Sequence, residues 1–174
     1  LTSTYHERPG GGKDIFVELS DVIGVVDIQA DIKIVDKDGN VVADTRAKER
    51  IRQTHFLADL AAKYGHTDEV AKKILQSHRN AMDDPNDLFV HLYEIRDALK
   101  IRFGGEKETK RVLRIPEEEW KDLGRLANAE PLTQGRHRGA KSGLRDATKQ
   151  EIDRGVAAAQ MMIENYLRYI DATL

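Results

Sequence analysis

The chain has 174 residues, 40% of them hydrophobic, and its 28 basic and 30 acidic residues leave a formal net charge of −2. This length and composition are typical of one folded domain, and the charge balance excludes a chain that is drawn as a whole to nucleic acid or to an anionic membrane. The absence of cysteine excludes disulfides, thiol catalysis and thiolate metal sites.

The first quarter of the chain carries a pattern of period two. Residues 1–13 are expected to form a flexible arm. Over residues 14–45 apolar and polar residues alternate, most clearly in Val26–Ile34, and such alternation is typical of half-buried strands. Asp38-Gly39 favours a tight turn before a returning strand. A further strand is expected at Ile15, Val17 and Leu19, so we predict an antiparallel β-hairpin or small sheet.

After Thr45 the apolar period becomes that of a helix. Thr67 is expected to cap the second helix, and Thr148-x-x-Glu151 is a capping box for the last one. The predicted helices cover about Ala47–Tyr64, a segment after Thr67, a segment from Asp84-Pro85 to Gly104-Gly105, Lys107–Leu113, a segment after Pro116, and Thr148 to about Ile170.

Each predicted helix has apolar residues on one face, which indicates a shared core. The expected inward residues are Ile51, Leu57, Leu60, Ala61, Val70, Ile74, Leu75, Leu88, Leu92, Ile95, Leu99, Trp120, Leu123, Leu126, Ile152, Val156, Ala159, Ile163, Tyr166 and Leu167. The predicted class is α+β, mainly α: a single domain over residues 14–174, with a β element at 14–45 and a bundle of five to six helices at 46–174. Ala157, Ala158, Met161 and Met162 give the last helix apolar character on more than one side, which favours a homodimer.

The longest connection between predicted helices, from Glu130 to Ala147, contains the densest run of basic charge, QGRHRGAKSGLR. Long connections in compact domains are usually functional or disordered. Glycines permit close approach to a ligand, and clustered arginines hold phosphate or carboxylate groups. The following helix N-terminus also favours an anion, although most such charge runs are solvated loops whose arginines pair with surface carboxylates. The expected anion-binding residues are Arg125, Arg136, His137, Arg138, Lys141 and Arg145.

Other motifs fail on inspection. Asp36-x-Asp38-Gly39-Asn40 begins like a calcium loop, but Val41 and Ala47 stand where an EF-hand needs Gly and Glu. No HExxH, GxxxxGKS, GxGxxG or GxSxG pattern is present, and no histidine pair has helical metal-site spacing. His78 and His91 could meet if their helices are neighbours. We expect no metal site and no cofactor.

Two patterns resemble a known family. Arg50 and His55 stand at the R-x4-H spacing of HEPN ribonucleases, which are small helical bundles. The strings DLFVHLYEIRDAL, GRLANAEPLTQGRHRG and ENYLRYI, within residues 86–171, also resemble HEPN-like bundles of uncharacterised bacterial proteins. The resemblance implies that Arg136, His137 and Arg138 lie in the loop before the last helix, where the family's R-x4-H motif is missing from this chain.

These observations lead to three functional hypotheses. The first is a binding or interaction protein whose basic loop holds an anionic ligand, RNA or a nucleotide. The second is a HEPN-like ribonuclease that works without a metal ion, and the third is a structural assembly domain. No apolar run approaches the roughly 20 residues that span a bilayer, and residues 1–13 lack the apolar core of a signal peptide. We therefore expect a cytoplasmic protein with no membrane contact.

Overall fold

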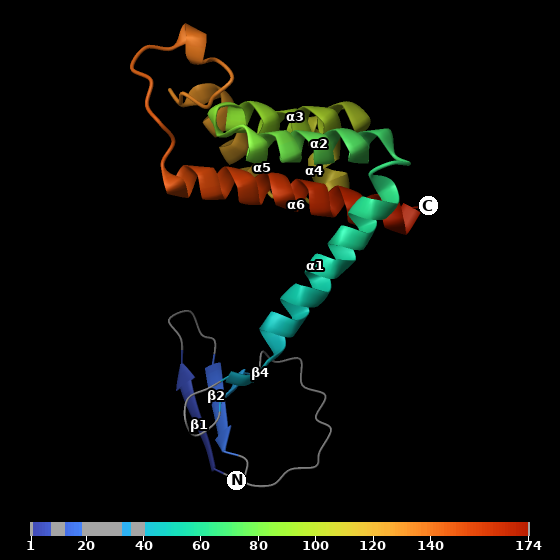
Figure 1. The fold of residues 1–174 in the computed structure, drawn as a ribbon, viewed down its shortest axis with the longest axis vertical. Helices are drawn as coiled ribbons and strands as arrows, with labels where there is room; N and C mark the ends of the chain where they lie inside the picture. The colour runs from blue at the N-terminus through green and yellow to red at the C-terminus, as the bar shows by residue number, and fades with distance from the viewer. Residues whose placement is uncertain (1, 8–12, 19–32, 36–40, 174) are drawn as a thin grey trace. The chain divides into compact units, whose positions relative to one another are not determined.

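The computed structural model describes residues 2–7, 13–18, 33–35 and 41–173 (Figure 1). By their contacts these residues fall into two compact units, 1–54 and 55–174. The described part is mainly α-helical, which confirms the mainly helical prediction. The helices are α1 (Thr45–Tyr64), α2 (Glu69–Asp83), α3 (Leu88–Arg102), α4 (Glu106–Leu113), α5 (Glu117–Gly124) and α6 (Lys149–Thr173).

The first unit contains two antiparallel strand pairs and the start of α1. Strand β1 (Thr2–Glu7), which lies in the segment expected as a flexible arm, pairs with β2 (Lys13–Glu18). Strand β3 (Lys33–Val35) pairs with β4 (Val41–Asp44), with a register shift between Ile34 and Val35. Most of the predicted Val26–Ile34 strand and the Asp38-Gly39 turn lie outside the described residues.

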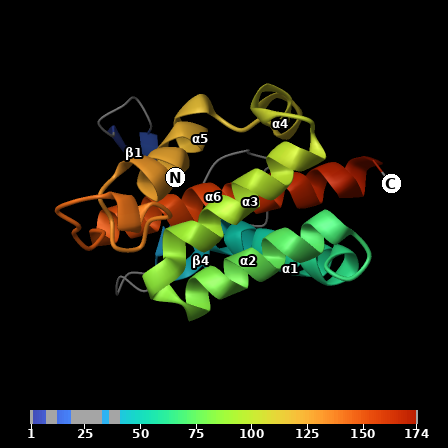
Figure 2. The ribbon, with the colours of Figure 1, turned by 90° about the horizontal axis from the view of Figure 1, so that it is seen from above.

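In the second unit, α2, α3 and α6 pack against one another, and α4 and α5 cover the remaining sides of α3 and α6 (Figure 2). The predicted stripe of α3, Leu88, Leu92, Ile95 and Leu99, is buried. Trp120 and Tyr166 are the largest fully buried side chains; Trp120 lies against Arg96 of α3, and Tyr166 contacts Phe103 and the α2 cap Asp68. This core holds the helices in place, and the charged side chains described below lie at the two ends of the helices.

Most of the residues expected to point inward are buried or half-buried. The structure differs from the sequence predictions at Ile51, at two residues of the expected dimer surface, and at the cap of α2. Ile51 is 58% exposed. Ala158 and Met162, on which the dimer expectation partly rested, are buried in the chain's own core. The cap of α2 is Asp68, not Thr67: the Asp68 carboxylate accepts a hydrogen bond from the Ala71 amide at 2.7 Å. Thr67 instead donates its hydroxyl to the Lys63 carbonyl, 3.0 Å away.

The capping box of α6 is confirmed. The Thr148 amide donates to Glu151 Oε2 at 2.8 Å, and the Glu151 amide donates to Thr148 Oγ1 at 3.2 Å. The connection before α6 contains no α-helix, as the absence of apolar periodicity predicted; it has a 3₁₀ turn at Arg138–Ala140 and an isolated bridge between Leu132 and Arg145. Within the described helices, none is long and apolar enough to cross a bilayer.

Candidate functional site

The basic loop before α6 is held in place by its own backbone. Leu132 and Arg145 form a parallel bridge: the Thr133 amide donates to the Arg145 carbonyl at 3.0 Å, and the Arg145 amide donates to the Pro131 carbonyl at 2.9 Å. The Arg136 amide donates to the Ala127 carbonyl at 2.8 Å. These hydrogen bonds join the two arms of the loop to each other and to the bundle, so they fix the backbone conformation of the loop.

Arg145 is engaged by the capping residue of α6. Its guanidinium donates to both carboxylate oxygens of Glu151, at 2.8 Å and 2.7 Å. The hydrogen bond from Arg145, followed by that from the Thr148 amide, lowers the pKa of Glu151 to about 2. The position at the helix N-terminus that we expected to receive an external anion is therefore filled by the chain's own Glu151.

Two further arginines of the predicted set pair with nearby carboxylates. Arg138 donates to Asp87 and, at 3.2 Å, to the Asn86 carbonyl, so it ties the loop to the start of α3. Arg125 donates to Asp122 at 2.6 Å and to Glu130. Arg145 also lies 3.6 Å from Glu130, so Arg125 and Arg145 do come together, with a shared carboxylate between them.

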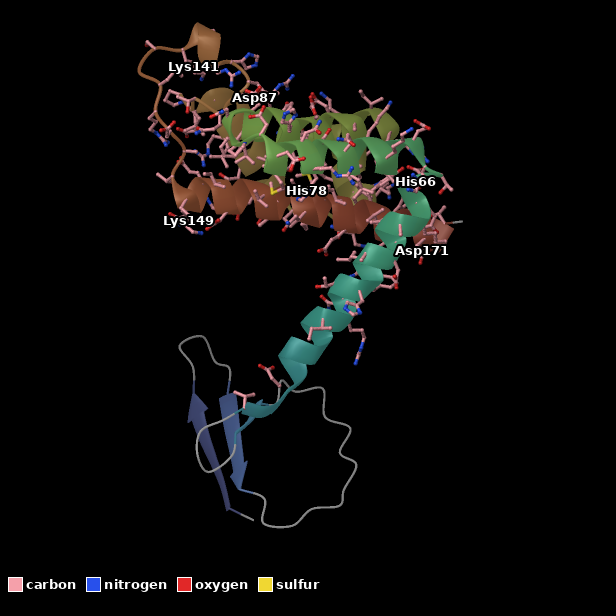
Figure 3. All side chains as sticks on the ribbon, viewed as in Figure 1. His66, His78, Asp87, Lys141, Lys149 and Asp171 are labelled. Atoms are coloured by element: carbon pink, nitrogen blue, oxygen red, sulfur yellow. The ribbon has the colours of Figure 1, made fainter. Side chains whose placement is uncertain are left out.

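The remaining predicted residues are less tightly paired. Arg136 lies over the Tyr93 ring, 4.3 Å from its centroid, and 3.4 Å from Asp97 Oδ2. Lys141 donates to the Ala129 carbonyl. Among the described residues, no hydrogen bond or ion pair engages the His137 side chain, which is exposed. Figure 3 shows Lys141 and Asp87 at the same end of the bundle, where cations and carboxylates intermingle.

His78 and His91, which could meet if their helices are neighbours, have different partners. His78 Nε2 lies 3.5 Å from the Gln160 amide nitrogen, and His91 Nδ1 lies 3.4 Å from Glu94. Burial lowers the pKa of His78. His55 is exposed, and the side chain of Arg50 lies outside the described residues. Within the part of the chain that the structure describes, no three His, Asp or Glu side chains gather as metal ligands.

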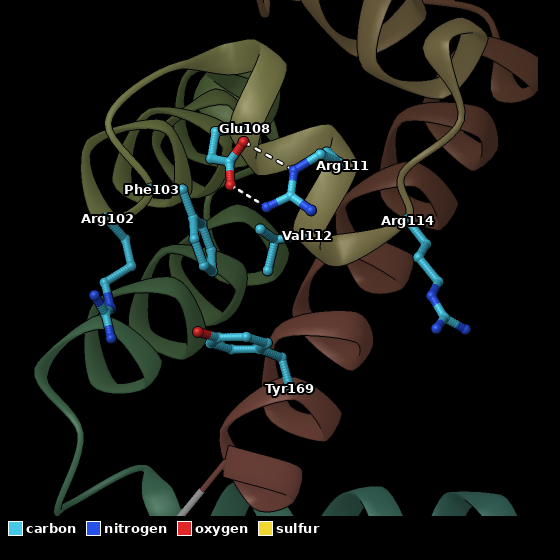
Figure 4. A pocket seen from close by; sticks show the side chains of 7 residues that line it. All are labelled: Arg102, Phe103, Glu108, Arg111, Val112, Arg114 and Tyr169. Carbon is cyan, nitrogen blue, oxygen red and sulfur yellow. Dashed lines mark hydrogen bonds and ion pairs between the residues drawn. The ribbon is translucent and has the colours of Figure 1, made fainter.

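A second basic cluster, which sequence reasoning missed, lines a hollow of about 690 Å³ between the end of α3, α4 and α6. Figure 4 shows Arg102 and Arg114 on either side of this arginine hollow, with Phe103 and Tyr169 between them and Arg111 above. The lining residues are Arg102, Phe103, Glu108, Arg111, Val112, Arg114 and Tyr169.

The arginine hollow has an excess of positive charge. Glu108 is the only acidic residue that lines it, and this carboxylate pairs with Arg111, whose Nε lies 2.9 Å from Glu108 Oε2. The Tyr166 hydroxyl beside Arg102 raises the pKa of that guanidinium. Arg114 ends α4 in the left-handed conformation, with φ of 51°, and no hydrogen bond or ion pair among the described residues engages its side chain. Arg114 therefore lines the hollow without a carboxylate partner among the described residues, whereas Arg102 lies beside Tyr166 and is also influenced by the Asp68 carboxylate.

A sequence signal for this cluster did exist. The stretch KIRFGGEKETKRVLR, residues 100–114, has six basic residues against two glutamates and contains an aromatic residue. The interspersed glutamates concealed it, because charges of both signs on a short helix usually indicate a solvated face. Only the fold shows that Arg111 and Arg114 share a hollow with Tyr169, more than fifty residues later in the chain.

Comparison with known proteins identifies no relative: no family model matches the chain, and no match is found among curated proteins or solved structures.

Proposed function

We propose that this chain is a binding protein for an anionic ligand and that the arginine hollow is its binding site. The observation that carries the proposal is the placement of Arg102, Arg111 and Arg114 around one hollow that a single carboxylate lines. Guanidinium groups bind phosphate and carboxylate in a bidentate manner, so three of them around one space favour an anion. The lone Glu108 competes only weakly, because an exposed ion pair contributes about 0–1 kcal/mol.

The basic loop supports anion binding less well than the arginine hollow does. A phosphate group that bound at Arg138 or Arg145 would have to replace Asp87 or Glu151, and it would leave those carboxylates unpaired. Arg136, His137 and Lys141 are the residues through which the loop could still contact an anionic partner. The two sites lie near opposite ends of α6: Glu151 and Tyr169 are 18 positions apart, or about 27 Å along a helix.

The test is a calorimetric titration of the protein with inorganic pyrophosphate at low salt. The double variant Arg111→Gln/Arg114→Gln should lose at least about tenfold in affinity, because two charge-assisted contacts are removed. The matched control Arg136→Gln/Lys141→Gln removes the same charge at the loop and should change the affinity less than about twofold. Glu108→Gln should strengthen binding, since it removes the internal competitor.

The outcomes separate the two sites. Loss of affinity in the loop variant alone would transfer the binding site to the basic loop. Unchanged affinity in both double variants, or no binding by the wild type, would refute the proposal.

Other expectations from the sequence remain proposals. A HEPN-like ribonuclease would use the exposed His137 or His55; RNA cleavage without metal that is lost in His137→Ala or in His55→Ala would favour it. An assembly domain would lose its oligomeric state, measured by light scattering, when the loop is neutralised. The α+β class rests on the strand pairs of the first unit. A homodimer would use the exposed Ala157 and the half-buried Met161.

A further inference from the structure

The arginine hollow is larger and more aromatic than a free phosphate requires. The hollow is wide open to solvent, and its volume of about 690 Å³ leaves room beside a bound phosphate. Phe103, Val112 and Tyr169 contribute an apolar part to the lining, next to the guanidinium groups. An inorganic anion would use only the cationic part, so the lining suits a ligand that has both a charged and an apolar portion.

The aromatic part of this lining is held rigidly. The Phe103 ring meets the Tyr169 ring edge to face, with centroids 5.3 Å apart and planes at 74°. Tyr166, which is fully buried, supports Tyr169 from within the bundle, with centroids 6.4 Å apart. These contacts restrict the Tyr169 ring, so the part of it that lines the hollow loses little conformational entropy when a planar group packs against it.

The charge of the hollow matches a short phosphate chain. Arg102, Arg111 and Arg114 against Glu108 leave two positive charges in excess. A diphosphate group carries a comparable negative charge and has enough oxygens for more than one bidentate arginine contact.

Resting on the proposed anion-binding function, we propose that the ligand of the arginine hollow is a nucleoside diphosphate. Its phosphates contact Arg102, Arg111 and Arg114, and its base stacks on Tyr169. Stacking on an aromatic ring is tolerant of base identity, so adenine, guanine and uracil nucleotides bind with similar affinity.

The experiment compares ADP, GDP and UDP with inorganic pyrophosphate by calorimetry on the full chain. Each nucleoside diphosphate should bind at least about fivefold tighter than pyrophosphate, the lower bound expected for one base stacked on one ring. Tyr169→Leu should remove this difference and retain pyrophosphate binding, whereas Tyr169→Phe should preserve both. Nuclear Overhauser contacts between the base protons and the Tyr169 ring, measured on the wild type, test the same contact without a substitution.

The results distinguish failure of the nucleotide assignment from failure of the proposed anion binding. If pyrophosphate binds and the nucleotides bind no tighter, the nucleotide assignment is refuted and the anion site stands. If neither binds, both are refuted. A single-stranded RNA oligomer that binds more than about 100-fold tighter than UDP would show that the site is part of a polymer track, and it would overturn the mononucleotide assignment.

Discussion

Replacement of Glu151 by Gln tests whether the basic loop serves stability. Glu151 occupies the N3 position of the α6 capping box, and its side chain is only 11% exposed. Gln keeps the shape of the side chain and can still accept the Thr148 amide, so the substitution mainly removes the charge that Arg145 faces. The expected result is a less stable bundle near neutral pH.

The magnitude follows from the pKa of this carboxyl. A fall from the usual 4.5 to about 2 corresponds to about 3 kcal/mol at full value. Arg145 is 43% exposed, so solvent screens part of the interaction, and we expect about 2 kcal/mol. Because the folded-state pKa is depressed, this contribution is complete above about pH 5. It is lost as the pH falls from 4.5 towards 2, where the folded state also takes up the proton.

The assay is urea unfolding followed by the fluorescence of Trp120, the single tryptophan, which is fully buried in the bundle. The difference in the free energy of unfolding between wild type and Glu151→Gln is measured at pH 7 and at pH 3. The exposed Glu119→Gln is the control for loss of one surface carboxylate. We expect the difference to shrink by more than half at pH 3. A Glu151→Gln variant as stable as the control at pH 7, or a difference that does not depend on pH, would refute the reasoning.

Two further predictions concern the packing and the capping of the bundle. Gly155→Ala should cost about 1–3 kcal/mol in urea unfolding, because a methyl group there would lie 2.6 Å from Cε1 of the buried Phe89, whereas Gly139→Ala, with no atom within 4 Å, should change little. An equal effect of the two substitutions would contradict the packing. Asp68→Ala should cost about 1–2 kcal/mol, because it removes the cap of α2 and the acceptor of the Tyr166 hydroxyl, 3.0 Å away. Thr67→Ala should cost less than half of that, and the reverse order would restore Thr67 as the cap.

The helical part of the fold could be predicted because its signals are local. Apolar spacing located α2 to α6 to within a few residues, and the capping box placed the start of α6. Thr67 was predicted as the cap of α2 in place of Asp68, because both of these adjacent residues favour a capping position. In the folded chain the Asp68 carboxylate also accepts a hydrogen bond from the hydroxyl of Tyr166, 98 positions away, a contact that local sequence cannot reveal.

The candidate sites show the limit of local signals. The composition of QGRHRGAKSGLR marked the loop as basic. The partners of its arginines include Asp87, just before α3, and Asp97, within α3, and spacing along the chain cannot assign them. Conversely, the basic residues of the arginine hollow were diluted by glutamates along the chain and became a cluster only when α4 was set beside α6.

The sequence by itself determined a mainly helical chain, the approximate limits of its helices, the α6 capping box and the position of the longest basic connection. These follow from hydrogen bonds and side-chain contacts between residues a few positions apart. Only the tertiary structure decided which cations are neutralised and which face a common space. Electrostatic interactions depend on distance in space and on solvent exposure, and both are set by packing between helices that are remote in the sequence.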